Sequence, residues 1–127
     1  MSNSNLIVLI VDDTPLIVKR EAEMLKELKG IGSILEAGSY HEAITVLKET
    51  IPDIILLDIH LPDKSGIELL RALKSQYPTI AVIMLTNQGN GNYKDICKRL
   101  GADHFIDKSK DFDLIPGIIA HYTAEKS

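Results

Sequence analysis

The stretch Pro52-Asp53-Ile54-Ile55-Leu56-Leu57-Asp58-Ile59-His60-Leu61-Pro62 decides the fold of this chain. Residues 54–57 are apolar without alternation, which is typical of a strand covered on both faces in the middle of a parallel sheet. Such a strand delivers Asp58 to its carboxyl end, the edge at which open α/β sheets form their ligand sites. An Asp at the end of a strand is also a common turn residue or helix cap. The stretch therefore predicts a central parallel strand, and the surroundings of Asp58 must decide its role.

Length and composition indicate one folded domain. The chain has 127 residues, of which 45% are apolar and 25% charged. These are the fractions of a globular protein, and they exclude the disordered, collagen-like and disulfide-scaffold classes. We predict a single domain over residues 1–127 with a core at about 6–122. The formal net charge is −4 and the Lys and Arg residues are scattered, so a direct nucleic-acid partner is not expected.

The sequence also bears on location. No apolar run approaches the ~18 residues that span a membrane, and residues 1–11 have neither a positive n-region nor a small-residue cleavage site. The single cysteine, Cys97, lies at an apolar helical position and is predicted to be a core thiol. We expect a cytoplasmic protein with no membrane partner.

Apolar runs and helical segments alternate along the whole chain. Strands are predicted at 6–11, 33–37, 54–57, 80–85 and about 104–106. A segment with helical spacing follows each of them, and Pro116 places the start of the last helix no earlier than about Asp113. This alternation predicts an α/β fold with a doubly wound five-stranded parallel sheet, flavodoxin-like, with five helices and right-handed crossovers. In the common strand order 2-1-3-4-5, the switch point lies between the strands that end in Asp12-Asp13 and Asp58.

Helix starts are predicted from capping residues. Thr14 is a good N-cap before the first helix. Ser39 and Ser65 each have a Glu three residues later, the spacing of a capping box. Residues 88–91 are rich in turn formers and predict a mobile loop, with Asn92 as the cap of the next helix.

Four of the five predicted strands end in polar side chains at one edge of the sheet: Asp12-Asp13, Asp58, Thr86 and Lys108. Each alone has a structural explanation as a turn, a cap or a surface cation. Together, the three carboxylates suit Mg²⁺, while Lys108 can neutralise phosphoryl oxygens and Thr86 can donate a hydrogen bond. Because an Asp carboxylate can be a nucleophile that forms an aspartyl-phosphate, we predict that Asp58 is a phosphoryl acceptor.

The chain resembles the receiver domains of two-component response regulators, in particular the single-domain chemotaxis-regulator type, from Leu6 to Tyr122. The motifs that carry the resemblance are Val11-Asp12-Asp13, Leu56-Leu57-Asp58-Ile59-His60-Leu61-Pro62 with Gly66, Thr86, Gly101-Ala102-Asp103 and Lys108.

The resemblance implies a donor and a metal. Asp58 would accept a phosphoryl group from a phosphohistidine on a sensor histidine kinase or a histidine phosphotransfer protein, with Mg²⁺ required. Asp13 and Asp58 would bind the metal directly, His60 would contribute its backbone carbonyl, and Asp12 would act chiefly through water.

The resemblance also implies a switch. Thr86 and Phe105 would change the surface of the fourth helix, fifth strand and fifth helix, to which a downstream effector protein binds. Two positions depart from the family pattern. Asn87 stands where a small residue is usual, so it bears on access to the phosphoryl group. Ser109 replaces the frequent Pro after Lys108, and because a cis peptide without Pro costs ~2.5–4 kcal/mol, the isomer of that bond is left open.

Two other functions compete with a phosphorylation switch. A Mg²⁺-dependent phosphohydrolase also uses an Asp nucleophile, but it usually carries a second acid two residues later, where this chain has His60. A flavodoxin-like cofactor binder fits the fold, but the acids after the first strand would repel a flavin phosphate. We predict a switch and not an enzyme, with catalysis limited to its own phosphotransfer and slow autodephosphorylation.

Overall fold

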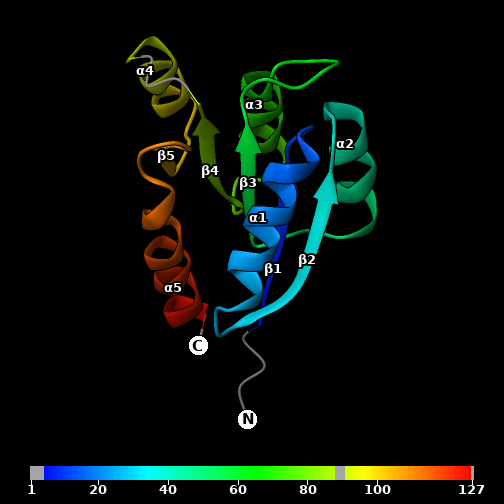
Figure 1. The fold of residues 1–127 in the computed structure, drawn as a ribbon. Coiled ribbons are helices and arrows are strands. Elements are labelled where there is room, and N and C mark those ends of the chain that lie inside the picture. The colour runs from blue at the N-terminus through cyan, green and yellow to red at the C-terminus, as the bar shows by residue number, and fades with distance from the viewer. Residues whose placement is uncertain (1–4, 88–90, 127) are drawn as a thin grey trace.

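A five-stranded parallel sheet forms the centre of the molecule, in a computed structural model that describes residues 5–87 and 91–126 (Figure 1). The strands are β1 (Leu6–Val11), β2 (Ile31–Ala37), β3 (Ile54–Asp58), β4 (Ala81–Thr86) and β5 (His104–Asp107). Their order is β2-β1-β3-β4-β5, and every neighbouring pair is parallel. The predicted fold class and strand order are confirmed.

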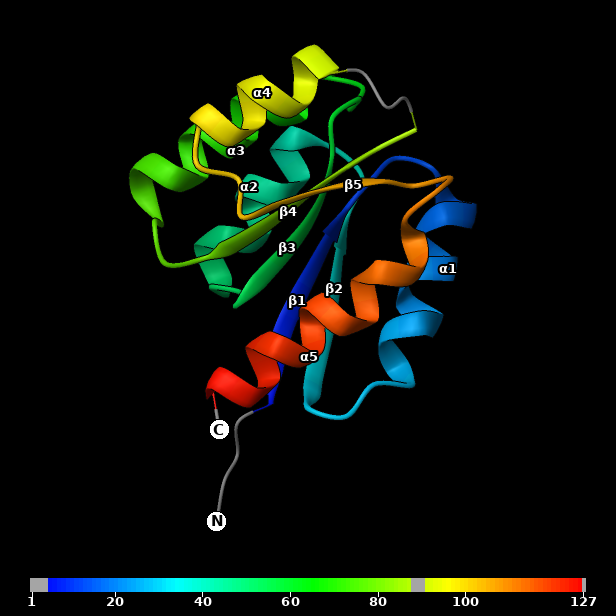
Figure 2. The same cartoon turned by 90° about the vertical axis from the view of Figure 1, so that its left-hand side faces the viewer.

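Helices cover both faces of the sheet. They are α1 (Pro15–Lys26), α2 (Tyr40–Glu49), α3 (Gly66–Gln76), α4 (Gly91–Arg99) and α5 (Ile115–Lys126), with a 3₁₀ turn, η1 (Phe112–Leu114), before the last. In Figure 2, α1 and α5 lie on one side of the sheet, and α2, α3 and α4 lie on the other. The molecule is therefore a three-layer sandwich, as the alternating pattern predicts.

The central strand β3 explains why its sequence does not alternate. All five of its residues are buried. Ile55 and Leu57 pack into the layer under α2, α3 and α4, while Ile54 and Leu56 pack into the layer under α1 and α5. Both faces of the strand are thus covered by apolar side chains, and no position is left for a solvent-facing residue.

Cys97 is also fully buried, as predicted.

The strand register brings the polar strand ends together. Val11 of β1 lies beside Leu57 of β3, so the residues that follow them reach the sheet edge at the same level. Thr86 of β4 lies beside Asp107 of β5, which places Lys108 just beyond the same edge. The carboxyl ends of four strands therefore meet at the switch point.

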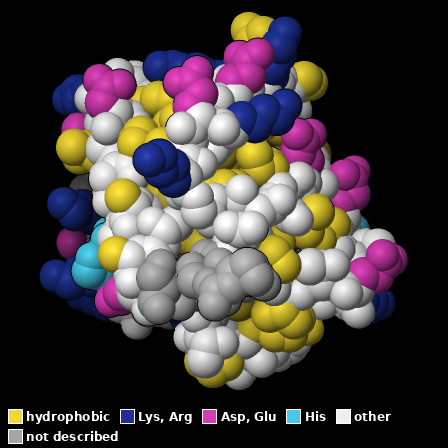
Figure 3. Space-filling view, turned by 90° about the horizontal axis from the view of Figure 1, so that it is seen from below, with side chains coloured by type: hydrophobic (Ala, Val, Ile, Leu, Met, Phe, Trp, Pro, Cys, Tyr) yellow, Lys and Arg dark blue, Asp and Glu magenta, His cyan; other side chains and the backbone are white. Residues whose placement is uncertain are grey.

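The opposite edge of the sheet holds the amino ends of the strands. Seen from that side in Figure 3, basic and acidic side chains are interspersed around apolar patches.

Within the described part of the chain, no helix is both long enough and apolar enough to cross a membrane.

Thr14 occupies the N-cap position of α1 as predicted, but without a side-chain bond, and the predicted cap Asn92 is wrong. The side chain of Thr14 makes no capping hydrogen bond; its own N–H donates to Asp12 Oδ1 over 2.9 Å, and Pro15 opens α1 with no N–H to satisfy. Asn92 does not precede α4, because the helix already includes Gly91. The loop predicted at 88–91 falls, for residues 88–90, outside the residues that the structure describes.

The two Ser caps are confirmed, with altered partners. Ser39 Oγ accepts from the N–H of Glu42 at 3.1 Å, but the Glu42 carboxylate reaches the N–H of Gly38 and not that of Ser39. Ser65 Oγ accepts from the N–H of Ile67 at 3.1 Å and not from residue 68. Both serines satisfy free N–H groups at a helix start.

Candidate functional site

Three carboxylates converge at the switch point of the sheet. Asp12 and Asp13 follow β1, Asp58 ends β3, and one oxygen from each lies within 4.8 Å of the others. Asp12 and Asp58 are buried, whereas Asp13 is exposed. Such a set of hard oxygen ligands, buried on one side and open on the other, fits Mg²⁺, which binds through few carboxylates and keeps several waters.

Lys108 lies among these acids. Its Nζ is 2.5 Å from Asp12 Oδ2 and 3.5 Å from Asp58 Oδ2, and the residue is only 5% exposed. Its backbone N–H donates to the Thr86 carbonyl over 2.7 Å, which fixes the residue to the end of β4. Burial alone would lower the pKa of Lys108, but the hydrogen bond to Asp12 and the charge of Asp58 raise it above its usual value. The lysine therefore stays charged and partly offsets the repulsion between the acids.

The ionisation of Asp58 depends on the same neighbours. Burial raises the pKa of Asp58 and the nearby Asp12 adds to the rise, while Lys108 and the N–H of His60 act against it. That N–H lies 3.4 Å from Asp58 Oδ1. Groups that add positive charge here therefore favour the ionised form of the Asp58 carboxyl.

The segment after Lys108 is held by Asp107. Asp107 Oδ1 accepts from the N–H and the hydroxyl of Ser109, at 2.8 and 2.7 Å, and from the N–H of Lys110 at 3.2 Å. The hydroxyl of Ser109 is the main cause that lowers the pKa of the Asp107 carboxyl. No described peptide bond is cis, so the bond between Lys108 and Ser109 is trans. The sequence left the isomer of this bond open. In the structure, hydrogen bonds to Asp107 hold the turn that contains it.

The three remaining predicted residues lie on β4, just after it, and on β5. Thr86 is fully buried at the end of β4, and Asn87 follows it in an exposed position. Phe105 is half-buried on β5, beside Met84, and packs against the layer under α2, α3 and α4. The structure thus places Thr86 at the edge that holds Asp58, with Phe105 one strand further out. Their roles as a switch remain predictions.

Glu21 is a buried acid that the sequence analysis missed. It lies on the inner face of α1, has no exposed surface, and neither of its carboxylate oxygens has a hydrogen-bond partner among the described residues. Burial, with the charge of Asp12 as the next cause, raises the pKa of Glu21 to about 8. A signal was present in the sequence, because Glu21 is three residues after Val18 and four before Leu25, on the apolar face of the helix.

An open groove of about 540 Å³ borders the acids. Asp12 and Asp13 line it together with residues of α1, the end of β2, and Gly38 and Glu42. The exposed Asp13 thus opens the acidic cluster to solvent on this side.

Gly66 fixes the start of α3 close to Asp58. A Cβ at this position would lie 2.0 Å from the carbonyl oxygen of Asp58, and the N–H of Gly66 donates to the Ile59 carbonyl over 2.7 Å. Only a glycine allows this approach. The connection that leaves Asp58 is therefore anchored at its far end.

A five-stranded parallel α/β sheet with an acidic cluster and a buried lysine at its switch point narrows the chain to α/β domains that carry an acidic site at the carboxyl edge of the sheet. Residues 8–120 match the family model described as the response regulator receiver domain. This chain belongs to that family, as the resemblance predicted.

Known proteins place the chain within the family. It is 30% identical over 115 residues to the transcriptional regulatory protein MalR of Bacillus subtilis. That match covers 91% of this chain and 49% of MalR. It is 35% identical over 104 residues to a putative transcriptional regulator of Pseudomonas aeruginosa, covering 82% of this chain and 50% of that protein. The chain therefore spans about half the length of these curated relatives.

Solved structures agree with the fold. A CheY-like receiver domain protein from Methanospirillum hungatei superposes with a TM-score of 0.84 at 27% identity, and the match covers 97% of each chain. Receiver domains are phosphorylation switches of two-component systems; they partner with histidine kinases and generally bind Mg²⁺ at an acidic pocket. In this chain Asp12, Asp13 and Asp58 form an acidic cluster that could hold a metal ion.

Proposed function

We propose that this chain is a Mg²⁺-dependent phosphoacceptor in which Asp58 receives a phosphoryl group from a phosphohistidine of a sensor kinase or a phosphotransfer protein. The observation that carries the proposal is the convergence of Asp12, Asp13 and Asp58 within 4.8 Å, with the buried Lys108 beside two of them. A solvated turn at the end of a strand would have no reason to gather three acids and a buried cation.

Asp58 is the nucleophile in this proposal. One of its carboxylate oxygens attacks phosphorus, and the bond between phosphorus and the donor imidazole nitrogen breaks with its electron pair going to that nitrogen. Asp13 and Asp58 would hold Mg²⁺ directly, His60 would contribute its backbone carbonyl, and Asp12 would act through water. The bound metal would offset the negative charge on the phosphoryl oxygens.

Lys108 and Thr86 contact the phosphoryl group once it is attached to Asp58. Lys108 Nζ is already 3.5 Å from Asp58 Oδ2, so its charge can reach a phosphoryl oxygen attached there. The Thr86 hydroxyl, at the end of β4, would donate to another oxygen. Movement of Thr86 toward the phosphoryl group and rotation of Phe105 would then alter the face made by α4, β5 and α5, where an effector protein binds. Asn87 borders the path of an attacking water and sets the lifetime of the phosphate.

We propose that residues 1–127 act as one receiver domain, with a core at about 6–122, in the cytoplasm where a histidine kinase delivers its phosphoryl group. Outside its own phosphotransfer and slow autodephosphorylation, the domain has no turnover. This separates it from a phosphohydrolase, which would release phosphate continuously from a phosphomonoester.

The test is incubation with Mg²⁺ and acetyl phosphate, followed by intact mass measurement. The wild type should gain one phosphoryl group per chain, and Asp58→Asn should gain none because the amide lacks the nucleophilic oxygen anion. Equal labelling of both proteins would place the acceptor elsewhere. Continuous release of phosphate from a phosphomonoester would favour the hydrolase instead.

A further inference from the structure

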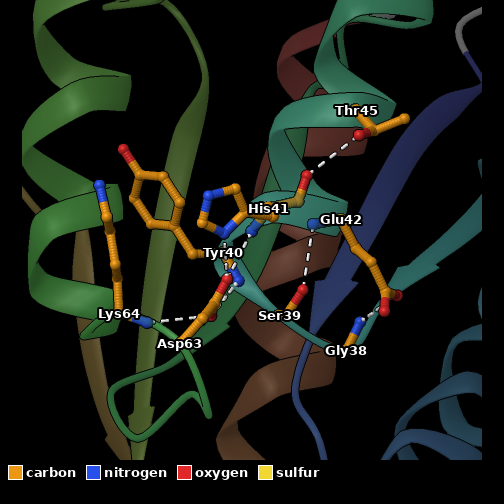
Figure 4. Close-up of polar contacts among 8 residues, drawn as sticks. All are labelled: Gly38, Ser39, Tyr40, His41, Glu42, Thr45, Asp63 and Lys64. Carbon is orange, nitrogen blue, oxygen red and sulfur yellow. Dashed lines mark hydrogen bonds and ion pairs between the residues drawn. The ribbon is translucent and has the colours of Figure 1, made fainter.

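Asp63 joins two segments that are distant in the sequence. It lies in the connection between β3 and α3, and its carboxylate reaches the start of α2 (Figure 4). Asp63 Oδ1 accepts from the N–H of Tyr40 at 2.9 Å and from that of Lys64 at 2.9 Å. Asp63 Oδ2 accepts from the N–H of His41 at 3.0 Å and lies 2.5 Å from His41 Nδ1. One carboxylate thus binds both segments.

For α2, this carboxylate is a cap supplied by another part of the chain. The first N–H groups of a helix have no partner within the helix and carry partial positive charge. Asp63 satisfies those of Tyr40 and His41, while Ser39 satisfies that of Glu42. Lys64 adds a second contact between the same segments, with Nζ 4.8 Å from the centre of the Tyr40 ring. The two segments are therefore joined at adjacent positions.

For the connection after β3, the carboxylate is one of two anchors. The other is Gly66, whose N–H bonds to the Ile59 carbonyl and whose missing side chain allows contact with the backbone of Asp58. His60 lies between Asp58 and these two anchors. Its N–H faces Asp58 Oδ1 at 3.4 Å, so a displacement of the connection changes the surroundings of the acceptor carboxylate.

We propose that Asp63 is a positioning residue for the phosphoacceptor site. By fixing the β3–α3 connection to the start of α2, it holds the backbone carbonyl and N–H of His60 in place relative to Asp58. This inference rests on the proposed function, because it assigns Asp63 a task in that reaction and no contact with the reacting atoms.

The surface location of the contact allows the idea to be tested without unfolding the protein. The side chains of His41 and Asp63 are 72% and 26% exposed, so a substitution leaves no buried charge behind. The helix start also offers a matched control. Ser39→Ala removes a capping hydrogen bond from the same turn of α2 but leaves the β3–α3 connection untouched.

The experiment measures Mg²⁺ affinity by calorimetry and the rate of labelling by acetyl phosphate, in the wild type, Asp63→Asn, Asp63→Glu and Ser39→Ala. Asp63→Asn should bind Mg²⁺ about 3- to 10-fold more weakly than the wild type. This loss is smaller than the loss expected when a group that bonds directly to a metal ligand is removed. Asp63→Glu keeps the charge and should recover part of that affinity. Ser39→Ala should lower the melting temperature while its Mg²⁺ affinity stays within about twofold of wild type, since the loop contact is intact.

The outcomes separate the two ideas. If the wild type binds Mg²⁺ and is labelled, but Asp63→Asn matches it in both, the inference is wrong and the proposed function stands. Equal loss of Mg²⁺ affinity in Ser39→Ala would also overturn it, because the effect would then come from α2 alone. A wild type that neither binds Mg²⁺ nor is labelled overturns both. Should Asp63→Asn fail to fold, His41→Gln weakens the same contact from the other side and must shift Mg²⁺ affinity in the same direction.

Discussion

Two carboxyl groups on opposite sides of the sheet differ in their state of ionisation. Glu21 lies under α1 with no exposed surface and no hydrogen-bond partner among the described residues, and its pKa is raised to about 8. Asp63 lies beside α2 at the surface and accepts from three backbone N–H groups and from His41. Desolvation acts to raise the pKa of Asp63, but these hydrogen bonds hold it well below its usual range.

The comparison shows that donors and water together decide whether an acid is charged. Burial raises the pKa of any carboxyl group, and hydrogen bonds to the ionised form lower it. Glu21 has burial without donors, so it holds a proton at neutral pH. Asp63 has donors and solvent, so it remains an anion and can hold two segments together. The same chemical group is a neutral core residue at one position and a charged anchor at the other.

The largest expected effect is on the pH dependence of stability. Glu21 has a folded pKa of about 8 against an ordinary value of 4.5, so its contribution to stability is fully present below about pH 4.5 and is lost as pH rises to about 8. At ~1.4 kcal/mol per pH unit, the loss is of the order of 3 to 5 kcal/mol. Glu21→Gln cannot ionise at this position, so the variant should not show this loss of stability with rising pH. Urea unfolding without metal at pH 5, 6.5 and 8 measures the difference in slope.

Glu23→Gln is the matched control for that measurement. Glu23 is an exposed acid on the same helix, so its substitution makes the same change in charge without altering the buried layer. It should keep the slope of the wild type. Parallel pH profiles for the wild type and Glu21→Gln would show that Glu21 is solvated and would remove the contrast with Asp63.

A smaller effect is expected from Mg²⁺ at the acids near Glu21. Binding to the folded state alone stabilises it by roughly 1.4–2.7 kcal/mol at ten to a hundred times Kd. Asp13→Asn should reduce this gain by removing a ligand, and it should raise metal-free stability only slightly because Asp13 is exposed. Bound Mg²⁺ also counters the effect of Asp12 on Glu21, so it should flatten the pH profile of the wild type.

Thermal unfolding at low salt, with and without millimolar Mg²⁺, measures this prediction. Lys19 lines the same groove but has no carboxylate to bind Mg²⁺. Lys19→Gln should therefore retain the Mg²⁺-induced shift of the wild type. Identical shifts for the wild type and Asp13→Asn would mean that Asp13 is a solvated turn residue and not a metal ligand.

The smallest expected effect concerns Asp63 in acid. Because its folded pKa is depressed, its contribution is present above its unfolded pKa of about 3.9 and is lost as pH falls through the lower folded value. The stability gap between the wild type and Asp63→Asn should therefore shrink below about pH 4. Ser39→Ala, which removes an uncharged cap, should show no such change. A gap that persists at the lowest pH would mean that the charge of Asp63 is not what joins the segments.

Much of the fold and the acidic cluster could be predicted from the sequence alone. Runs such as 54–57, apolar without alternation, require a strand buried on both faces, and their alternation with helical segments leaves few topologies. In parallel strands every carboxyl end meets one edge, so Asp12, Asp13, Asp58, Thr86 and Lys108 could be placed together from their positions after the strands.

Other features were decided only by the tertiary structure. Asp63 bonds to residues more than twenty positions earlier in the chain, and that contact exists because the register of the strands brings one loop beside the start of α2. Lys108 Nζ lies closer to Asp12 than to Asp58 for the same reason. A local pattern specifies periodicity and chain direction, but a hydrogen bond between distant segments depends on distances of a few ångströms that only the packed layers define.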